Sequence, residues 1–122
     1  MLLIDAANVV GSRPTGWWRD RAGAARAFVD RLRAALDAGR LAGPVVVVLE
    51  GGARRGVESG EQGGLTVLHA PGSGDDTLVK VVATAPDHPV TLVTADRELR
   101  RRAEALGADV AGPGWLWDLL QE

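Results

Sequence analysis

Five acidic residues of this 122-residue sequence stand where an apolar run ends or where a helical pattern begins. They are Asp5, Glu50, Asp75, Asp76 and Asp96. Carboxylates brought together in a low dielectric repel one another unless a cation lies between them. Their oxygen atoms are hard ligands and the sequence has no Cys, so Mg²⁺ or Mn²⁺ is favoured over Zn²⁺. The chemistry open to these residues is therefore that of a divalent cation held by carboxylates.

Apolar runs and helical patterns alternate along the chain, and these elements would have to position the acids. Strands are expected at residues 2–4, 45–49, 65–70, 90–93 and 109–111, and helices at 20–38, 75–84, 97–106 and 115–120. Asp20 is the predicted N-cap of the first helix, and Gly39 follows its end. This order predicts one α/β domain over residues 1–122, a three-layer α/β/α sandwich with a mainly parallel sheet of about five strands. The carboxyl ends of parallel strands meet at one edge, so the acids should gather there.

Each acid also has a purely structural interpretation. Asp75, Asp76 or Asp96 could cap the helix that it opens, and Glu50 could be a solvated strand end. Asp5 follows a run typical of a buried strand and caps no helix that the pattern predicts. Taken together, several carboxylates at one edge favour the functional interpretation.

Three sequence blocks, in order along the chain, resemble the motifs of the PIN-like NYN-domain ribonucleases of bacteria. They are LIDAANVV at residues 3–10, GDDTL at 74–78 and LVTADREL at 92–99. The first carries an Asp with an Asn three residues later, the second opens a helix with paired acids, and the third has a Thr-x-Asp after a strand. With the spacing between the blocks, the resemblance covers nearly the whole chain.

This resemblance implies a PIN-like fold and a metal-dependent endoribonuclease acting on single-stranded RNA. Carried over by position, Asp5, Asp76 and Asp96 would bind Mg²⁺ or Mn²⁺, with Glu50 and Glu98 as further candidate ligands. The two remaining catalytic positions are Asn8, which would orient a carboxylate or a water, and Asp75, which would support the metal ligands. Such ions can activate the attacking water and relieve charge on the leaving oxygen.

A ribonuclease must also hold its substrate. The candidate RNA contacts are Arg13, Arg54, Arg55 and Arg97, with Trp17 and Trp18 as candidate stacking residues. Arg54 and Arg55 lie in a Gly-rich segment, residues 51–64, that is predicted to be a mobile loop beside the active edge. The helix arginines could instead form a solvated face, and Trp17 and Trp18 could pack under their loop. Trp115 and Trp117 favour a core position or a subunit contact, which would suit a homodimer.

Composition narrows the function classes further. Without Cys there is no disulfide and no thiolate nucleophile, and the longest aliphatic run is far shorter than a membrane span. With no signal-peptide pattern, a cytoplasmic protein without membrane contact is expected. A receiver-like domain would need a Lys ending a late strand, whereas Lys80 falls inside a predicted helix, and a haloacid-dehalogenase phosphatase would need an Asp at Ala7.

The net charge of −2 argues against a protein held on RNA by bulk charge. Together with Arg100, which stands where a further acid could be, it motivates an alternative: a non-catalytic RNA- or protein-binding module that keeps the fold. Setting aside the five clustered acids, however, 11 acids remain against 14 basic residues. The acidity of the chain is thus concentrated in the predicted site.

Overall fold

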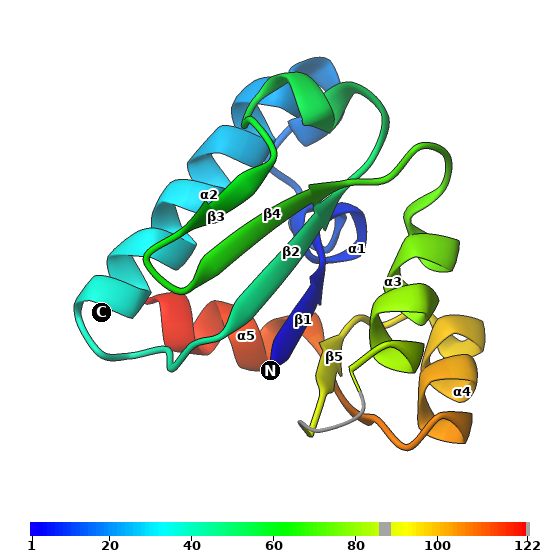
Figure 1. The fold of residues 1–122 in the computed structure, drawn as a ribbon. Helices are drawn as coiled ribbons and strands as arrows, with labels where there is room; N and C mark the ends of the chain where they lie inside the picture. The colour runs from blue at the N-terminus through cyan, green and yellow to red at the C-terminus, as the bar shows by residue number, and fades with distance from the viewer. Residues whose placement is uncertain (86–88, 122) are drawn as a thin grey trace.

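The computed structural model describes residues 1–85 and 89–121, which form a six-stranded sheet between two layers of helices (Figure 1). The strands are β1 (Leu2–Asp5), β2 (Val45–Leu49), β3 (Gly60–Gln62), β4 (Leu65–His69), β5 (Thr91–Val93) and β6 (Asp109–Ala111), in the order β3-β4-β2-β1-β5-β6. Every neighbouring pair is parallel except β3 with β4. The predicted mainly parallel α/β architecture is confirmed.

The sixth strand arises inside the segment that was predicted to be a loop. Gly63 and Gly64 have φ values of 62° and 84°, which let the chain turn back in two residues so that β3 pairs with β4. A tight hairpin of this kind requires left-handed residues, which Gly adopts without steric cost.

Five α-helices and two short 3₁₀-helices lie between or after the strands in the described ranges. They are α1 (Ala6–Gly11), η1 (Trp17–Arg19), α2 (Arg21–Asp37), η2 (Gly51–Arg55), α3 (Gly74–Ala83), α4 (Arg97–Ala105) and α5 (Pro113–Leu120). The predicted cap of α2 is confirmed, because an Asp20 carboxylate oxygen accepts a hydrogen bond of 2.9 Å from Gly23 N. Gly39, just past the end of α2, has a φ of 77°. No helix in the described ranges is long and apolar enough to cross a membrane.

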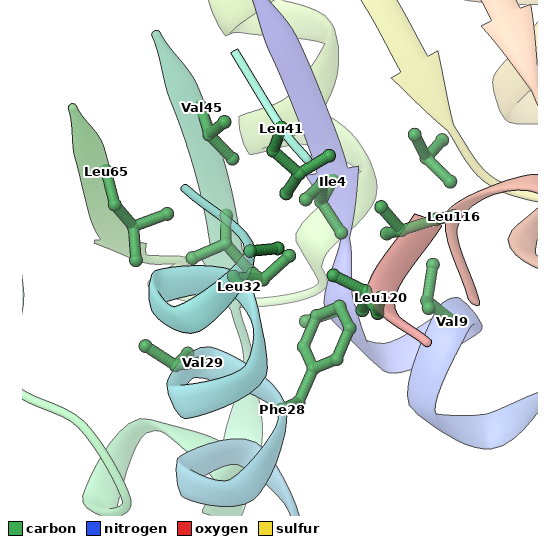
Figure 2. Packing of buried hydrophobic residues seen from close by; sticks show 14 of the residues in the cluster. Ile4, Val9, Phe28, Val29, Leu32, Leu41, Val45, Leu65, Leu116 and Leu120 are labelled. Atoms are coloured by element: carbon green, nitrogen blue, oxygen red, sulfur yellow. The ribbon is translucent and has the colours of Figure 1, made fainter. Parts of the chain in front are cut away.

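Alternating residues of the central strands send apolar side chains to the two faces of the sheet. Ile4 and Val47 pack with α2 and α5, where Phe28, Leu32 and Leu116 complete the cluster (Figure 2). The intervening residues of β1 and β2 pack with α3 and α4 on the other face; these are Leu3, Val46 and Val48. Strands that are covered by helices on both faces have continuous apolar sequences, which explains the Val-rich sequence of β2.

The order of the strands fixes where a functional crevice can form. From β1 the chain builds outward through β2 and β4, then returns by α3 to place β5 on the opposite side of β1. In open α/β sheets, ligands bind outside the carboxyl ends of the strands at such a reversal. Here the reversal lies between β1 and β5.

Candidate active site

Asp5 lies at this reversal, at the end of β1, and its side chain is held from two sides. One carboxylate oxygen accepts a hydrogen bond of 3.3 Å from Asn8 N, and the other accepts one of 2.9 Å from the Thr94 hydroxyl. The residue is 6% exposed. The sequence predicted no helix after Asp5, but α1 begins at the next residue and Asp5 is its N-cap. The carboxylate therefore has a structural role as well as a place at the candidate site.

The surroundings of Asp5 raise its pKa to about 6. Burial is the largest cause, because it disfavours the charged form. The bonds from Thr94 and Asn8 lower the pKa in part, whereas the nearby carboxylates of Asp75 and Glu50 raise it. Ionising Asp5 in the folded protein therefore costs free energy, and a nearby cation would offset this cost.

The loop between β5 and α4 is fixed against β1 and α1. The Asn8 side-chain oxygen accepts a hydrogen bond of 2.8 Å from Ala95 N, and Arg100 Nε donates one of 2.7 Å to the Thr94 carbonyl. The Thr94 hydroxyl also accepts a bond of 3.2 Å from Asp96 N. Asp96 caps α4 by accepting a bond of 3.0 Å from Leu99 N, as one interpretation of the sequence held. Asn8 and Arg100 therefore position the segment that carries Asp96.

Replacing Thr94 tests this network directly. Thr94→Val keeps the shape of the side chain but removes the hydroxyl, so the pKa of Asp5 should rise further above about 6, because the Thr94 bond lowers it. The buried polar groups left without a partner should also reduce the free energy of unfolding by about 1–3 kcal/mol. Carboxyl-carbon NMR titration measures the first effect and urea unfolding the second. Thr94→Ser is the control and should restore both values; an unchanged pKa in Thr94→Val would contradict the bond.

The paired acids that open α3 point in different directions. Burial raises the pKa of Asp75, the nearby Asp96 and Asp76 raise it further, and Arg102 lowers it. The Asp76 side chain is 87% exposed and accepts a bond of 3.3 Å from Arg102 Nη2. Successive residues of a helix point about 100° apart, so only one of two adjacent acids can face a given edge. Here Asp75 faces the other acids, whereas the resemblance to the family's motifs implied that Asp76 would bind the metal.

Glu50 follows β2 and connects the acids to the start of α3. One of its carboxylate oxygens accepts a hydrogen bond of 3.1 Å from Gly74 N, the first residue of α3. A Cβ at Gly74 would lie 3.2 Å from the other oxygen, so glycine permits this close approach. Glu50 also raises the pKa of Asp5, which places the two carboxylates near each other.

The donor set suits a hard divalent cation, but the side chains do not converge on one point. Among residues 1–85 and 89–121, no group of three acidic or histidine side chains is close enough to hold an ion. Glu98, a further candidate ligand, is exposed and forms an ion pair with Arg101. The acids therefore fit a metal by their chemistry, and the side chains would have to turn toward one another to coordinate it.

The candidate RNA contacts come from three segments, which are the loop after α1, η2 and α4. Arg54 donates bonds of 3.2 Å to the Gly51 carbonyl and 3.3 Å to the Ala70 carbonyl. The segment that was expected to be a loop thus contains two regular elements, η2 and β3. Arg55 and Arg97 are exposed, and the Arg13 guanidinium lies 4.3 Å from the centre of the Trp117 ring.

The four tryptophans differ in their surroundings. Trp117 is buried, as a core position requires, and donates bonds of 3.2 Å to the Val9 carbonyl and the Ser12 hydroxyl. Trp115 and Trp18 are exposed, and Trp17 is half-buried.

His69 is the histidine of the described ranges, and it forms no metal-binding group with the acids there. His69 Nε2 lies 2.7 Å from the Val57 carbonyl, a bond that fixes the loop after η2. His88 lies outside the described residues.

A cavity of about 240 Å³ opens beside Glu50, and sequence reasoning missed it. Its lining includes Ala6, Ala7 and Trp17, together with the charged residues Arg21 and Glu50. It forms because α1 follows β1 at once and brings small side chains next to η1. A pair of alanines after Asp5 was the only signal in the sequence, and alone it does not indicate a cavity.

No family model and no curated protein sequence matches this chain. A solved structure does: the crystal structure of a mutant of Rae1 (YacP) from Bacillus subtilis has a TM-score of 0.72. The match covers 98% of this chain and 72% of that chain, at 16% sequence identity. At this identity the likeness shows a common fold, and it supports the three-layer α/β/α PIN-like fold that the motifs predict.

Proposed function

We propose that this chain is an endoribonuclease that hydrolyses single-stranded RNA with Mg²⁺ or Mn²⁺ at the carboxyl edge of its sheet. The observation that carries the proposal is the position of Asp5: a buried carboxylate with a pKa of about 6, next to Glu50 and Asp75, at the reversal of the strand order. The three motif blocks support it, because each contributes a residue to this edge. When bound, the ion would supply an activated water and relieve negative charge on the leaving oxygen.

The protein's own residues have separate roles in this proposal. Asp5, Asp75 and Asp96 would hold the ion, with Glu50 as a further ligand. Thr94 fixes the Asp5 carboxylate, and Asn8 fixes the backbone next to Asp96. These bonds limit how far the acids can separate, which lowers the cost of bringing them together around a cation.

Basic residues near this edge would bind the phosphate backbone. Arg97 begins α4 and Arg55 ends η2, and both are exposed close to segments that carry the acids. Arg102 bonds with Asp76 and lies near Asp75. The proposed partner is therefore RNA, and homodimer formation stays a prediction that gel filtration can test.

Cleavage of end-labelled single-stranded RNA tests the proposal. Purified protein should produce internal cuts with Mg²⁺ or Mn²⁺, and EDTA should abolish them. Asp75→Asn should reduce the rate by more than the roughly 10- to 100-fold that loss of a residue supporting a metal ligand costs. The matched control is the adjacent Asp76→Asn, which should retain most of the activity because Asp76 points to solvent and Arg102. Equal losses in the two variants would contradict the assignment of Asp75.

One observation favours a second candidate function. In the described ranges the acids do not form a ready site for an ion, which would suit an RNA-binding module without catalysis. Stoichiometric RNA binding that EDTA does not change, with no cleavage under any divalent ion, would establish this alternative and overturn the first.

A further inference from the structure

We propose that the cavity beside Glu50 is a subsite for one unpaired nucleobase of the RNA, stacked against Trp17. The inference rests on the proposed function for its substrate class, single-stranded RNA. It adds a base-binding site next to the acidic edge, and it identifies the aromatic residue that would contact the base.

The lining of the cavity suits a flat ring with polar edges. Most of the wall is apolar and comes from small or aliphatic side chains such as Ala6, Ala7 and Val10. Only two charged side chains line it, Arg21 and Glu50, one a hydrogen-bond donor and the other an acceptor. Apolar walls with a few polar groups at fixed places are typical of small-ligand sites.

Trp17 is held in place as a platform. Its ring packs on Gly11, where a Cβ would lie 3.4 Å from a ring carbon. The Arg21 guanidinium lies over the ring, 5.0 Å from its centre, so a stacking base would move it aside. Trp18 contacts the ring edge-on with the two centres 6.1 Å apart. A ring that is already fixed loses little freedom when a base stacks on it, which favours binding. Trp18 is exposed and does not line the cavity.

The cavity shares Glu50 with the acidic edge. Glu50 lines the cavity, bonds to Gly74 at the start of α3 and raises the pKa of Asp5. Ala6 and Ala7 come directly after Asp5 in the chain. A base in the cavity would therefore belong to a nucleotide whose phosphate lies beside the acids.

A second cavity, of about 340 Å³, is also lined by Trp17 and indicates the path of the RNA strand. The two cavities have Val10, Trp17 and Ala24 in common. Arg13 and Arg31 line the second one, with guanidinium carbons 4.3 Å and 5.6 Å from the centre of the Trp117 ring. Cations at this position complement a phosphate of a neighbouring nucleotide, as an extended single strand requires. This complementarity favours RNA over an apolar ligand.

Binding of a short fluorescein-labelled single-stranded RNA in EDTA, followed by anisotropy, tests the subsite. Stacking on an aromatic residue contributes about 1–3 kcal/mol per base, so Trp17→Ala should weaken binding roughly 5- to 150-fold. Trp17→Phe should retain most of the affinity. The matched control is Trp115→Ala: Trp115 is 46% exposed and lines neither cavity, so its loss should leave the affinity unchanged.

An abasic nucleotide moved along the same RNA locates the base. At one position, the abasic nucleotide should weaken binding to the wild type as much as Trp17→Ala weakens binding of the intact RNA. At that position it should cause no further loss of affinity in Trp17→Ala. If thermal unfolding shows that Trp17→Ala does not fold, Ala7→Leu replaces it, because Ala7 is exposed and a larger side chain there fills the cavity from outside the core. The subsite would be overturned if Trp17→Ala and Trp115→Ala bound the RNA equally well, or if Ala7→Leu bound it as well as the wild type. It would also be overturned if the losses caused by the abasic nucleotide and by Trp17→Ala added together.

The outcome separates this inference from the proposed function. Trp17-dependent binding without metal-dependent cleavage would refute the ribonuclease and leave the subsite standing. Metal-dependent cleavage with normal RNA binding by Trp17→Ala would refute the subsite alone.

Discussion

Asp5→Asn should abolish RNA cleavage and, in the absence of metal, make the folded chain more stable. The loss of activity should exceed the roughly 10- to 100-fold cost of losing a residue that supports a metal ligand, because Asp5 is proposed to contact the ion itself. The gain in stability follows from its pKa, which rises from 3.8 to about 6 on folding. A neutral amide at this position removes the cost of burying a charge.

The pH dependence of stability gives the sign of this effect. The folded state binds the Asp5 proton more tightly than the unfolded state. The contribution of Asp5 to the free energy of unfolding of the wild type is therefore largest below pH 4 and is lost as the pH rises through 6. The shift sets an upper limit of about 3 kcal/mol, and the weaker bond to Thr94 in the variant reduces the net gain to about 1–2 kcal/mol. Asp5→Asn should therefore exceed the wild type at pH 8 and approach it at pH 4 in urea unfolding.

Two controls complete the experiment on Asp5. Asp118→Asn, an exposed residue of α5, should change neither cleavage nor the pH dependence of stability. Added Mn²⁺ should raise the unfolding temperature of the wild type and leave that of Asp5→Asn nearly unchanged, because only the wild type keeps the proposed ligand of the ion. Full cleavage activity in Asp5→Asn would contradict the assignment of Asp5 to the active site.

Gly56→Ala should destabilise the protein strongly although its backbone conformation allows any residue. Gly56 is buried where the segment after η2 crosses α2, and a Cβ there would overlap the Ala22 carbonyl oxygen and lie 2.8 Å from its carbon. Helix backbone cannot move aside as a flexible side chain can. We expect a loss of about 3 kcal/mol or more, which for a domain of this size lowers the unfolding temperature by at least roughly 10 °C.

The control for Gly56 lies four residues earlier. At Gly52 a Cβ would meet only the Arg21 side chain, at an ordinary contact distance of 3.7 Å, so Gly52→Ala should leave the unfolding temperature nearly unchanged. Gly56 also receives a hydrogen bond of 3.2 Å from Arg26 Nε at its carbonyl, and displacement of this segment should weaken RNA cleavage. Equal unfolding temperatures for the two variants would mean that η2 does not pack against α2 as described.

The sequence predicts the elements that local patterns specify. The Val-rich run of β2 and the cap at Asp20 have strong local signals, and both elements formed where they were expected. By contrast, α1 contains two Val residues and ends in Gly, which are poor helix formers. It is stabilised by its local cap at Asp5 and by burial of Val9 in the core, and the burial depends on residues far away in the sequence.

The candidate site was predicted in its composition but not in its geometry. Parallel strands bring their carboxyl ends together, so the meeting of acids at one edge follows from the order of the elements. Which acid of an adjacent pair faces that edge depends on the rotation of α3, and this is set by Leu78 and Val82 packing on the sheet. The bonds of Thr94 and Asn8, and the cavity beside Glu50, depend on contacts between segments far apart in the chain.

The bond between Asp5 and Thr94 has a consequence for the order of events during synthesis. These residues are 89 positions apart, so a nascent chain that has been made only through α3 carries Asp5, Glu50 and Asp75 but neither Thr94 nor Asp96. The acidic edge is complete only after β5 has been made and has paired with β1. Under the proposed function, an unfinished chain on the ribosome would therefore lack a complete site for cleaving the message that encodes it.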